Sequence, residues 1–266
     1  MTGTNPLNVL FMPFGRMIIA RIRLLGQYAL FIGESFRQLF ILPWSLKKIV
    51  QQVYFIGMKS VSVVCLTAAF TGMVLGLQGY YTLVKVGSEG LLGAGVALTL
   101  IRELGPVMTA IMVIARAGSA MAAELGIMRI SEQIDALETM DINPIRFMVS
   151  PKLGAAIISF PLLTAMCDVV GIMGGYLTGV VLLGIDSGIF FARIHSTVQL
   201  HDVTEGFIKS FVFAIVVTTV CCYNGFNAHR GTDFGAKSVS MATTTAVVVS
   251  CVLVLVTDYI LTSLLL

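Results

Sequence analysis

The stretch LLGAGVALTLIRELGPVMTAIMVIA, residues 91–115, decides the fold class. It exceeds the roughly 20 apolar residues that a helix needs to cross a bilayer core, although it contains Arg102 and Glu103. Four further apolar runs reach or approach that length, at 61–77, 153–183, 207–222 and 241–266. Over the whole chain 57% of residues are apolar and only 12% are charged, against about 25% charged in soluble domains. The sequence predicts an all-α integral membrane protein with five transmembrane helices, and it excludes a soluble enzyme.

The first 52 residues are expected to form a separate N-terminal segment before a five-span domain at 53–266. Residues 17–40 have helical periodicity but carry charged side chains, such as Arg23, Glu34 and Arg37, that would be costly in hydrocarbon. We therefore expect an amphipathic helix on the membrane surface, followed by an elbow at Pro43 and Trp44. A sixth, broken span is the alternative.

Basic residues indicate how the chain is oriented. Seven Lys and Arg precede the first span, four lie in the loop 116–152 and two in the loop 223–240, and these segments share one side of the membrane. The opposite side has three, namely Lys85, Arg193 and Lys209. Because basic loops stay cytoplasmic, we expect a cytoplasmic N-terminus and a periplasmic C-terminus.

Arg102 and Glu103 are the most informative ionisable residues. Neighbouring residues on a helix point about 100° apart, so these two cannot pair well with each other. Ionised groups at membrane depth usually line a polar cavity, and Pro106 frees a backbone carbonyl one turn away. We expect a polar cavity within the membrane; the structural alternative is a buried ion pair with a neighbouring span, for which Asp168 in the third span is one candidate partner of Arg102. A functional alternative is an ion-coupled secondary transporter or channel that uses Arg102, Glu103 and Asp168.

Glycines at 72 and 76, and at 171, 175 and 179, have the spacing of close helix contacts. Packing within the chain is the favoured interpretation, and a homodimer face is the other.

The polar stretch 131–141 predicts a short cytoplasmic helix, capped by Ser131 and ended by Asn143 before Pro144. It is either a solvated loop helix or one that docks in a groove of a soluble partner. Its apolar face and its surrounding acids are Ile134, Ala136, Leu137 and Met140, and Glu132, Asp135, Glu138 and Asp141.

Catalytic chemistry finds little support. The segment 231–238 nearly fits a phosphate-binding loop, but it joins two membrane spans and leaves no room for a nucleotide-binding fold, so we expect no ATPase in this chain. The five cysteines lie in apolar runs, where packing is their expected role, and no metal site is predicted. The net charge of +3 gives no support for a nucleic-acid partner. We therefore expect a non-catalytic chain without a cofactor of its own, since no residues for an enzyme site are found.

Several motifs together resemble the MlaE (YrbE) permease family. They are Arg102-Glu-Leu-Gly-Pro-Val107, Ala115-Arg-Ala-Gly-Ser119, Ala123-Glu-Leu-Gly126, Glu132-Gln-Ile-Asp-Ala-Leu-Glu138 and Asn143-Pro144, and the similarity covers roughly residues 55–262. The resemblance implies a permease subunit of an ABC transporter in the bacterial inner membrane. Such a transporter moves glycerophospholipids between that membrane and a periplasmic MCE-domain carrier, which maintains outer-membrane lipid asymmetry.

The resemblance also implies partners and site residues. The partners are a second copy of the chain, an MlaF-like cytoplasmic ABC ATPase that supplies ATP and Mg²⁺ chemistry, an MlaB-like STAS-domain subunit and an MlaD-like MCE-domain hexamer. The implied lipid-binding residues are Leu75, Tyr80, Leu83, Arg102 and Glu103. The helix at 131–141 corresponds to the coupling helix, in which the implied ATPase contacts are Glu132, Asp135, Ala136, Leu137, Glu138 and Met140. The stretch before the last span, Lys237-Ser-Val-Ser-Met241, departs from the family pattern.

Overall fold

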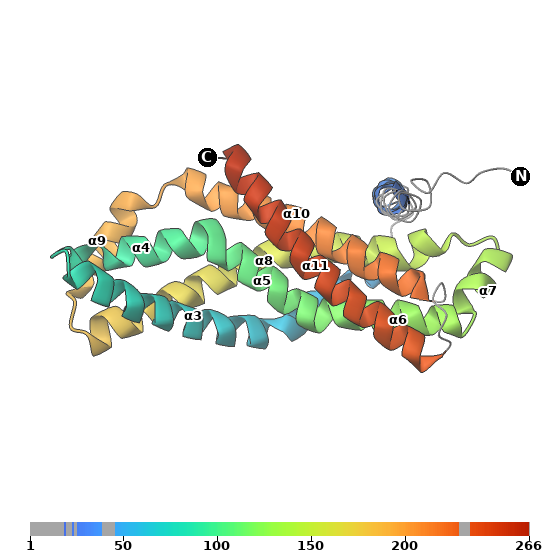
Figure 1. Cartoon of the computed structure of the whole chain (residues 1–266), viewed down its shortest axis with the longest axis horizontal. Coiled ribbons are helices and arrows are strands. Elements are labelled where there is room, and N and C mark those ends of the chain that lie inside the picture. Colours follow the sequence, from blue (N-terminus) through green and yellow to red (C-terminus); the bar gives the residue numbers. More distant parts are fainter. Residues whose placement is uncertain (1–18, 20–22, 24–25, 39–45, 229–234, 266) are drawn as a thin grey trace, which may run out of the picture.

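The computed structural model describes residues 19, 23, 26–38, 46–228 and 235–265, and these residues contain helices and turns but no strand. Within the described ranges, five helices are long and apolar enough to cross a membrane: Leu46–Val84, Glu89–Ile130, Ile145–Leu182, Leu200–Phe226 and Ala236–Leu265. They form one elongated bundle (Figure 1). The prediction of an all-α chain with five spans is confirmed.

Most of the spans are built from several helical pieces. The first consists of α2 (Leu46–Val53), the π-helical turn η1 (Tyr54–Met58) and α3 (Lys59–Val84). The second consists of α4 (Leu92–Thr99), η3 (Leu100–Leu104), α5 (Gly105–Val113), η4 (Ile114–Gly118) and α6 (Ser119–Ile130), after the short turn η2 (Glu89–Leu91). The third consists of η5 (Ile145–Val149), α8 (Ser150–Tyr176) and η6 (Leu177–Leu182). The last two are single helices, α10 (Leu200–Phe226) and α11 (Ala236–Leu265), and α9 (Ser187–Thr197) precedes α10.

The loop expected at 116–152 is largely helical, because the second span continues as α6 to Ile130. Charged residues of this region have hydrogen-bond or ion-pair partners within the bundle, and these partners offset the free-energy cost of burying the charges. Arg116 donates to the backbone oxygen of Phe55 at 2.6 Å, and Lys152 on α8 pairs with Glu124 on α6 at 2.6 Å.

The closest helix contact joins α3 to α8, where glycines let the two backbones touch. A Cβ at Gly72 would overlap the backbone oxygen of Gly171, and one at Gly174 would overlap that of Ala69. A Cβ at Gly76 would come within 2.8 Å of Thr178 Oγ1. The glycine pattern therefore serves packing within the chain, as the favoured interpretation expected.

Residues 26–38 form a helix that Figure 1 shows nearly end-on, so its axis runs across the long axis of the bundle. Tyr28 and Phe31 pack on Tyr223 of α10, with ring centroids 4.0 and 5.5 Å apart. The hydroxyl of Tyr223 donates to Gln27 Oε1 at 2.9 Å. This orientation agrees with a membrane-surface helix, which stays a prediction; the elbow at Pro43 and Trp44 lies outside the described residues.

The cytoplasmic helix predicted at 131–141 is shorter in the structure, where α7 spans Gln133–Thr139. Ser131 does not cap it, because the Ser131 hydroxyl donates to the Ile127 oxygen and the residue ends α6. Asn143 does not end α7 either; its Oδ1 accepts from the backbone of Ile145 and Arg146 and so starts the third span. The prediction of a short helix is correct, and both of its predicted boundary residues are wrong.

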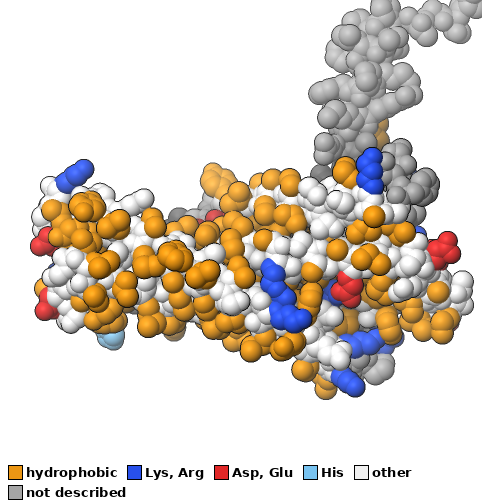
Figure 2. All heavy atoms as spheres, turned by 90° about the horizontal axis from the view of Figure 1, so that it is seen from below, with side chains coloured by type: hydrophobic (Ala, Val, Ile, Leu, Met, Phe, Trp, Pro, Cys, Tyr) orange, Lys and Arg blue, Asp and Glu red, His pale blue; other side chains and the backbone are white. Residues whose placement is uncertain are grey.

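Apolar side chains cover much of the side of the bundle, and acidic side chains lie near both ends (Figure 2). The last span is the least enclosed, since only 17% of its most apolar window is buried, against 67% for α10. This distribution fits a bundle whose sides face lipid.

The glycine contact gives a stability prediction. Gly72→Ala places a methyl group against the α8 backbone, which cannot yield as a flexible side chain would, so we expect the midpoint of thermal unfolding in detergent to fall by about 5 °C. Gly95→Ala is the matched control, because no atom lies within 4 Å of the added Cβ. Equal midpoints for the two variants would contradict this account of the α3–α8 contact.

Candidate functional site

The second span widens into a π-helical turn, η3, at Arg102 and Glu103. The N–H of Gly105 bonds to the oxygen of Leu100, five residues earlier. Pro106 has no N–H, so it cannot serve the carbonyl of Arg102 four residues before it. Lys209 of α10 takes over this role, because its Nζ donates to the Arg102 oxygen at 2.9 Å. The backbone oxygen that Pro106 was expected to free therefore accepts a hydrogen bond from a lysine side chain instead.

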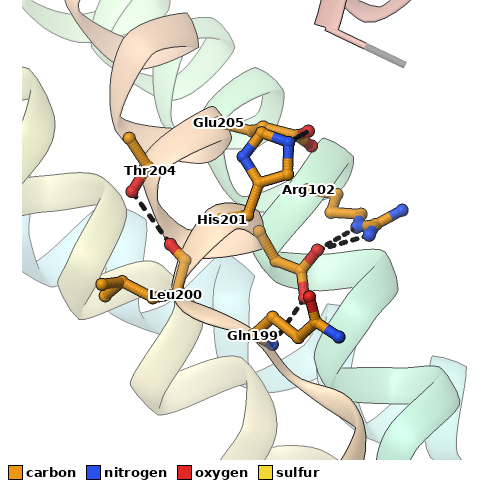
Figure 3. A network of polar contacts seen from close by, with 7 residues as sticks. Arg102, Gln199, Leu200, His201, Thr204 and Glu205 are labelled. Atoms are coloured by element: carbon orange, nitrogen blue, oxygen red, sulfur yellow. Dashed lines mark hydrogen bonds and ion pairs between the residues drawn. The ribbon is translucent and has the colours of Figure 1, made fainter.

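The Arg102 guanidinium binds a carboxylate from α10. Its Nε donates to Asp202 Oδ1 at 2.7 Å, and Nη2 donates to the same oxygen (Figure 3). The other oxygen of Asp202 accepts from the backbone N–H of Gln199 at 2.7 Å, which caps the first turn of α10. Asp202 is 2% exposed, and each of its two oxygens accepts at least one hydrogen bond from within the protein.

The ion pair with a neighbouring span that was the structural alternative is therefore present, but its candidate partner Asp168 is wrong. Asp168 Oδ1 lies beside Gly105 of α5, where any Cβ would overlap it, and it is buried without a hydrogen-bond partner among the described residues. Arg102 instead turns toward α10, because η3 places its side chain against Asp202.

Glu103 joins a second cluster, centred on Lys209. Lys209 Nζ lies 2.7 Å from Glu103 Oε2, 2.7 Å from Thr262 Oγ1 and 3.4 Å from Asp258 Oδ1. The Thr262 hydroxyl donates to Glu103 at 3.2 Å. Because Lys209 is 2% exposed, this ammonium joins the second span, α10 and α11 at one buried point.

The two clusters line a common cavity of about 290 Å³. Its lining combines charged groups with the apolar ends of the spans: Leu98, Thr99, Arg102, Glu103, Glu205, Lys209, Thr262 and Leu265. Arg102 and Glu103 are each 39% exposed, so they face this space while their partners are buried behind them. The structure thus contains the predicted polar cavity between the spans, and its depth in the membrane stays a prediction.

The five predicted lipid-binding residues fall into two groups. Arg102 and Glu103 line the cavity beside α10 and α11. Leu75, Tyr80 and Leu83 are partly buried between α3 and α4, in the cluster that contains Leu92, Val96 and Leu100. Within one chain, the charged group and the apolar group thus contact different neighbouring helices.

Sequence reasoning missed the partners of Arg102 and Glu103. Asp202, Glu205 and Lys209 recur at intervals of three and four, so they share one face of α10. This spacing could have revealed a polar stripe, but the fourth span was expected to begin only at 207. Lys209 was counted as an external charge, whereas it lies inside α10.

The predicted ATPase contacts at α7 differ in their exposure to solvent. Glu132, Asp135, Ala136, Glu138 and Met140 are exposed. Leu137, by contrast, is partly buried against the apolar cluster that holds Ile134, which is fully buried. Asp135 pairs with Arg129 at 2.6 Å. The surface that α7 offers to a partner therefore combines carboxylates with Met140, and Leu137 belongs mainly to the protein's own core.

The comparisons with known proteins agree with this architecture. The family model described as permease MlaE matches residues 49–264. The chain belongs to the MlaE permease family. This MlaE-family chain is 41% identical over 216 residues to the intermembrane phospholipid transport system permease protein MlaE of Haemophilus influenzae, covering 81% of each chain.

Two further relatives of this MlaE-family chain span different lineages. A probable ABC transporter permease of Rickettsia typhi is 38% identical over 251 residues, 94% of this chain and 95% of that one. The chloroplastic protein TRIGALACTOSYLDIACYLGLYCEROL 1 of Arabidopsis thaliana is 37% identical over 213 residues, 80% of this chain and 60% of that one. ABC transporter permeases among the relatives do not favour the ion-coupled alternative built on Arg102, Glu103 and Asp168.

The position of Lys209 gives a second prediction. Lys209→Met leaves two carboxylates and one backbone oxygen without their buried cation, so we expect a loss of about 3–5 kcal/mol in denaturant unfolding in detergent. Lys85→Met, at an exposed position, is expected to change stability by less than about 0.5 kcal/mol. Adding Asp258→Asn to Lys209→Met should recover part of the loss; no loss in the single variant would show that Lys209 does not hold the spans together.

Proposed function

We propose that this chain is the permease subunit of an ATP-driven transporter that moves glycerophospholipids between the bacterial inner membrane and a periplasmic MCE-domain carrier. The observation that carries the proposal is the charged cavity between three apolar spans of an MlaE-family chain. Ionisable residues inside a membrane-spanning bundle typically mark a functional site, because their desolvation is costly. The phospholipid transport named in the Haemophilus relative supplies the matching cargo.

In this proposal Arg102 receives the lipid phosphate. Its Nε and Nη2 are bonded to Asp202, which fixes the guanidinium plane and leaves Nη1 for another acceptor. A guanidinium is well suited to a phosphate because its donors lie in one plane. Leu75, Tyr80 and Leu83 would contact the acyl chains, and the exposed apolar faces of α3 and α11 offer surface for a second copy of the chain.

Energy for transport would come from a cytoplasmic ABC ATPase that contacts α7. The exposed carboxylates at α7 and Met140, the residue directly after it, form a small mixed surface of the kind that docks in a groove. The proposal includes a STAS-domain subunit and an MCE-domain hexamer as further partners, a cytoplasmic N-terminus and a periplasmic C-terminus. The permease itself then performs no catalysis.

The lipid site is tested by Arg102→Ala. Loss of the guanidinium removes the charged donor for phosphate, so we expect about fivefold less phospholipid to co-purify with the tagged chain in gentle detergent, measured by mass spectrometry. Lys85→Ala removes an exposed basic residue at the periplasmic end and should retain the wild-type amount. Equal retention by both folded variants would remove Arg102 from the site.

The ATPase contact is tested by the double substitution Glu138→Ala with Met140→Ala. Both side chains are exposed, so the spans should stay intact while the partner loses contacts; we expect about tenfold less ATPase to co-purify and lipid-stimulated ATP hydrolysis to fall in step. Glu89→Ala, at the opposite end of the bundle, is the control. Unchanged hydrolysis by the double variant would refute the role of α7.

A further inference from the structure

We propose that Glu205 makes the cavity selective for zwitterionic phospholipids whose headgroup ends in a primary ammonium, such as phosphatidylethanolamine, over anionic phospholipids such as phosphatidylglycerol. The inference rests on the proposed function and adds the headgroup class of the cargo.

The two cations of the cavity are already neutralised by carboxylates. Arg102 is bonded to Asp202, and Lys209 lies between Glu103 and Asp258. Glu205 is a fourth carboxylate, so the groups around the cavity comprise two cations and four anions. A lipid that brings only negative charge would add to this excess, whereas an ammonium would reduce it.

Among the described residues, Glu205 forms no salt bridge with a lysine or an arginine, although it is near enough to Arg102 to feel its charge, and Arg102 is bonded to Asp202. The Glu205 side chain is 9% exposed, and it lines the cavity one turn away from Asp202 on the same face of α10. Its ion-pair partner among the described residues is His201, with Nε2 and Oε1 3.2 Å apart, and a histidine is charged only when it is protonated. A buried carboxylate next to a neutral imidazole is costly, and a cationic ligand group would remove that cost.

The cavity beside Glu205 provides the space for such a group. His201 stands over Glu205 from the first turn of α10, and its side chain is 67% exposed, so it can turn into solvent when an ammonium takes its place. Arg102 approaches from the neighbouring helix on the Asp202 side. An ammonium at Glu205 and a phosphate at Arg102 Nη1 are the two ends of an ethanolamine phosphate.

The size of the cavity supports a headgroup rather than a whole lipid. Its volume of about 290 Å³ lies just below that of ligand pockets, which range over about 300–1,000 Å³. The acyl chains must therefore lie outside it, along apolar surface.

The experiment uses the transporter purified through the tagged chain and reconstituted in nanodiscs of equimolar phosphatidylethanolamine and phosphatidylglycerol with identical acyl chains. After re-extraction in gentle detergent, mass spectrometry gives the ratio of the two retained lipids. We expect the wild type to favour phosphatidylethanolamine by about fivefold and Glu205→Gln to retain the two lipids equally, because glutamine keeps the shape and loses the charge. Glu89→Gln, an exposed carboxylate outside the cavity, should keep the wild-type ratio.

A wild type without preference, or a Glu205→Gln variant that keeps the preference, overturns the inference while leaving lipid transport intact. A wild type that retains neither lipid overturns the proposed function instead. If Glu205→Gln does not fold, soluble headgroups give the same information: glycerophosphoethanolamine should displace lipid from the wild type and glycerophosphoglycerol should not. Displacement by both or by neither contradicts the role of Glu205.

Discussion

The polar centre of this bundle depends on the hydrogen bonds and ion pairs that the ammonium of Lys209 forms. Pro106 leaves the Arg102 carbonyl without its helical donor, and Lys209 supplies one from another span. The same ammonium forms ion pairs with Glu103 of the second span and Asp258 of α11. A single buried charge thus supplies a missing backbone hydrogen bond and pairs with two carboxylates in an apolar bundle. Without it, the second span and α11 would each expose an uncompensated anion to a medium of low dielectric constant.

The five spans could be predicted from the sequence because a helix in lipid must be apolar along its length. This requirement does not depend on which helices pack against each other. The same holds for the polar cavity, since Arg102 and Glu103 cannot be placed in hydrocarbon without one. The identity of their partners depends on how the second span is rotated about its axis. The π-helical turn η3 changes that rotation within one turn, so a regular period of 100° per residue cannot choose between Asp168 and Asp202.

The boundaries of α7 were unpredictable for a different reason. Glu132 and Asp141 take positive φ angles of 56° and 58°, which residues with a Cβ seldom adopt, and they interrupt the helix at both ends. Tertiary contacts compensate for this backbone cost: Ile134 is fully buried, and Leu137 packs against the same cluster. Sequence patterns indicated an amphipathic helix correctly, but could not show that two of its four apolar residues belong to the core of the protein.

Ile134 connects α7 to the opposite end of the bundle. The cluster that holds it also contains Cys222 and Tyr223, near the C-terminal end of α10. The opposite end of this 27-residue helix carries Asp202, Glu205 and Lys209, and an unbroken helix of that length is a rod of about 40 Å. A displacement of α7 therefore acts on one end of a rigid helix whose other end holds the charges of the cavity, so one piece of secondary structure joins two distant surfaces of the bundle.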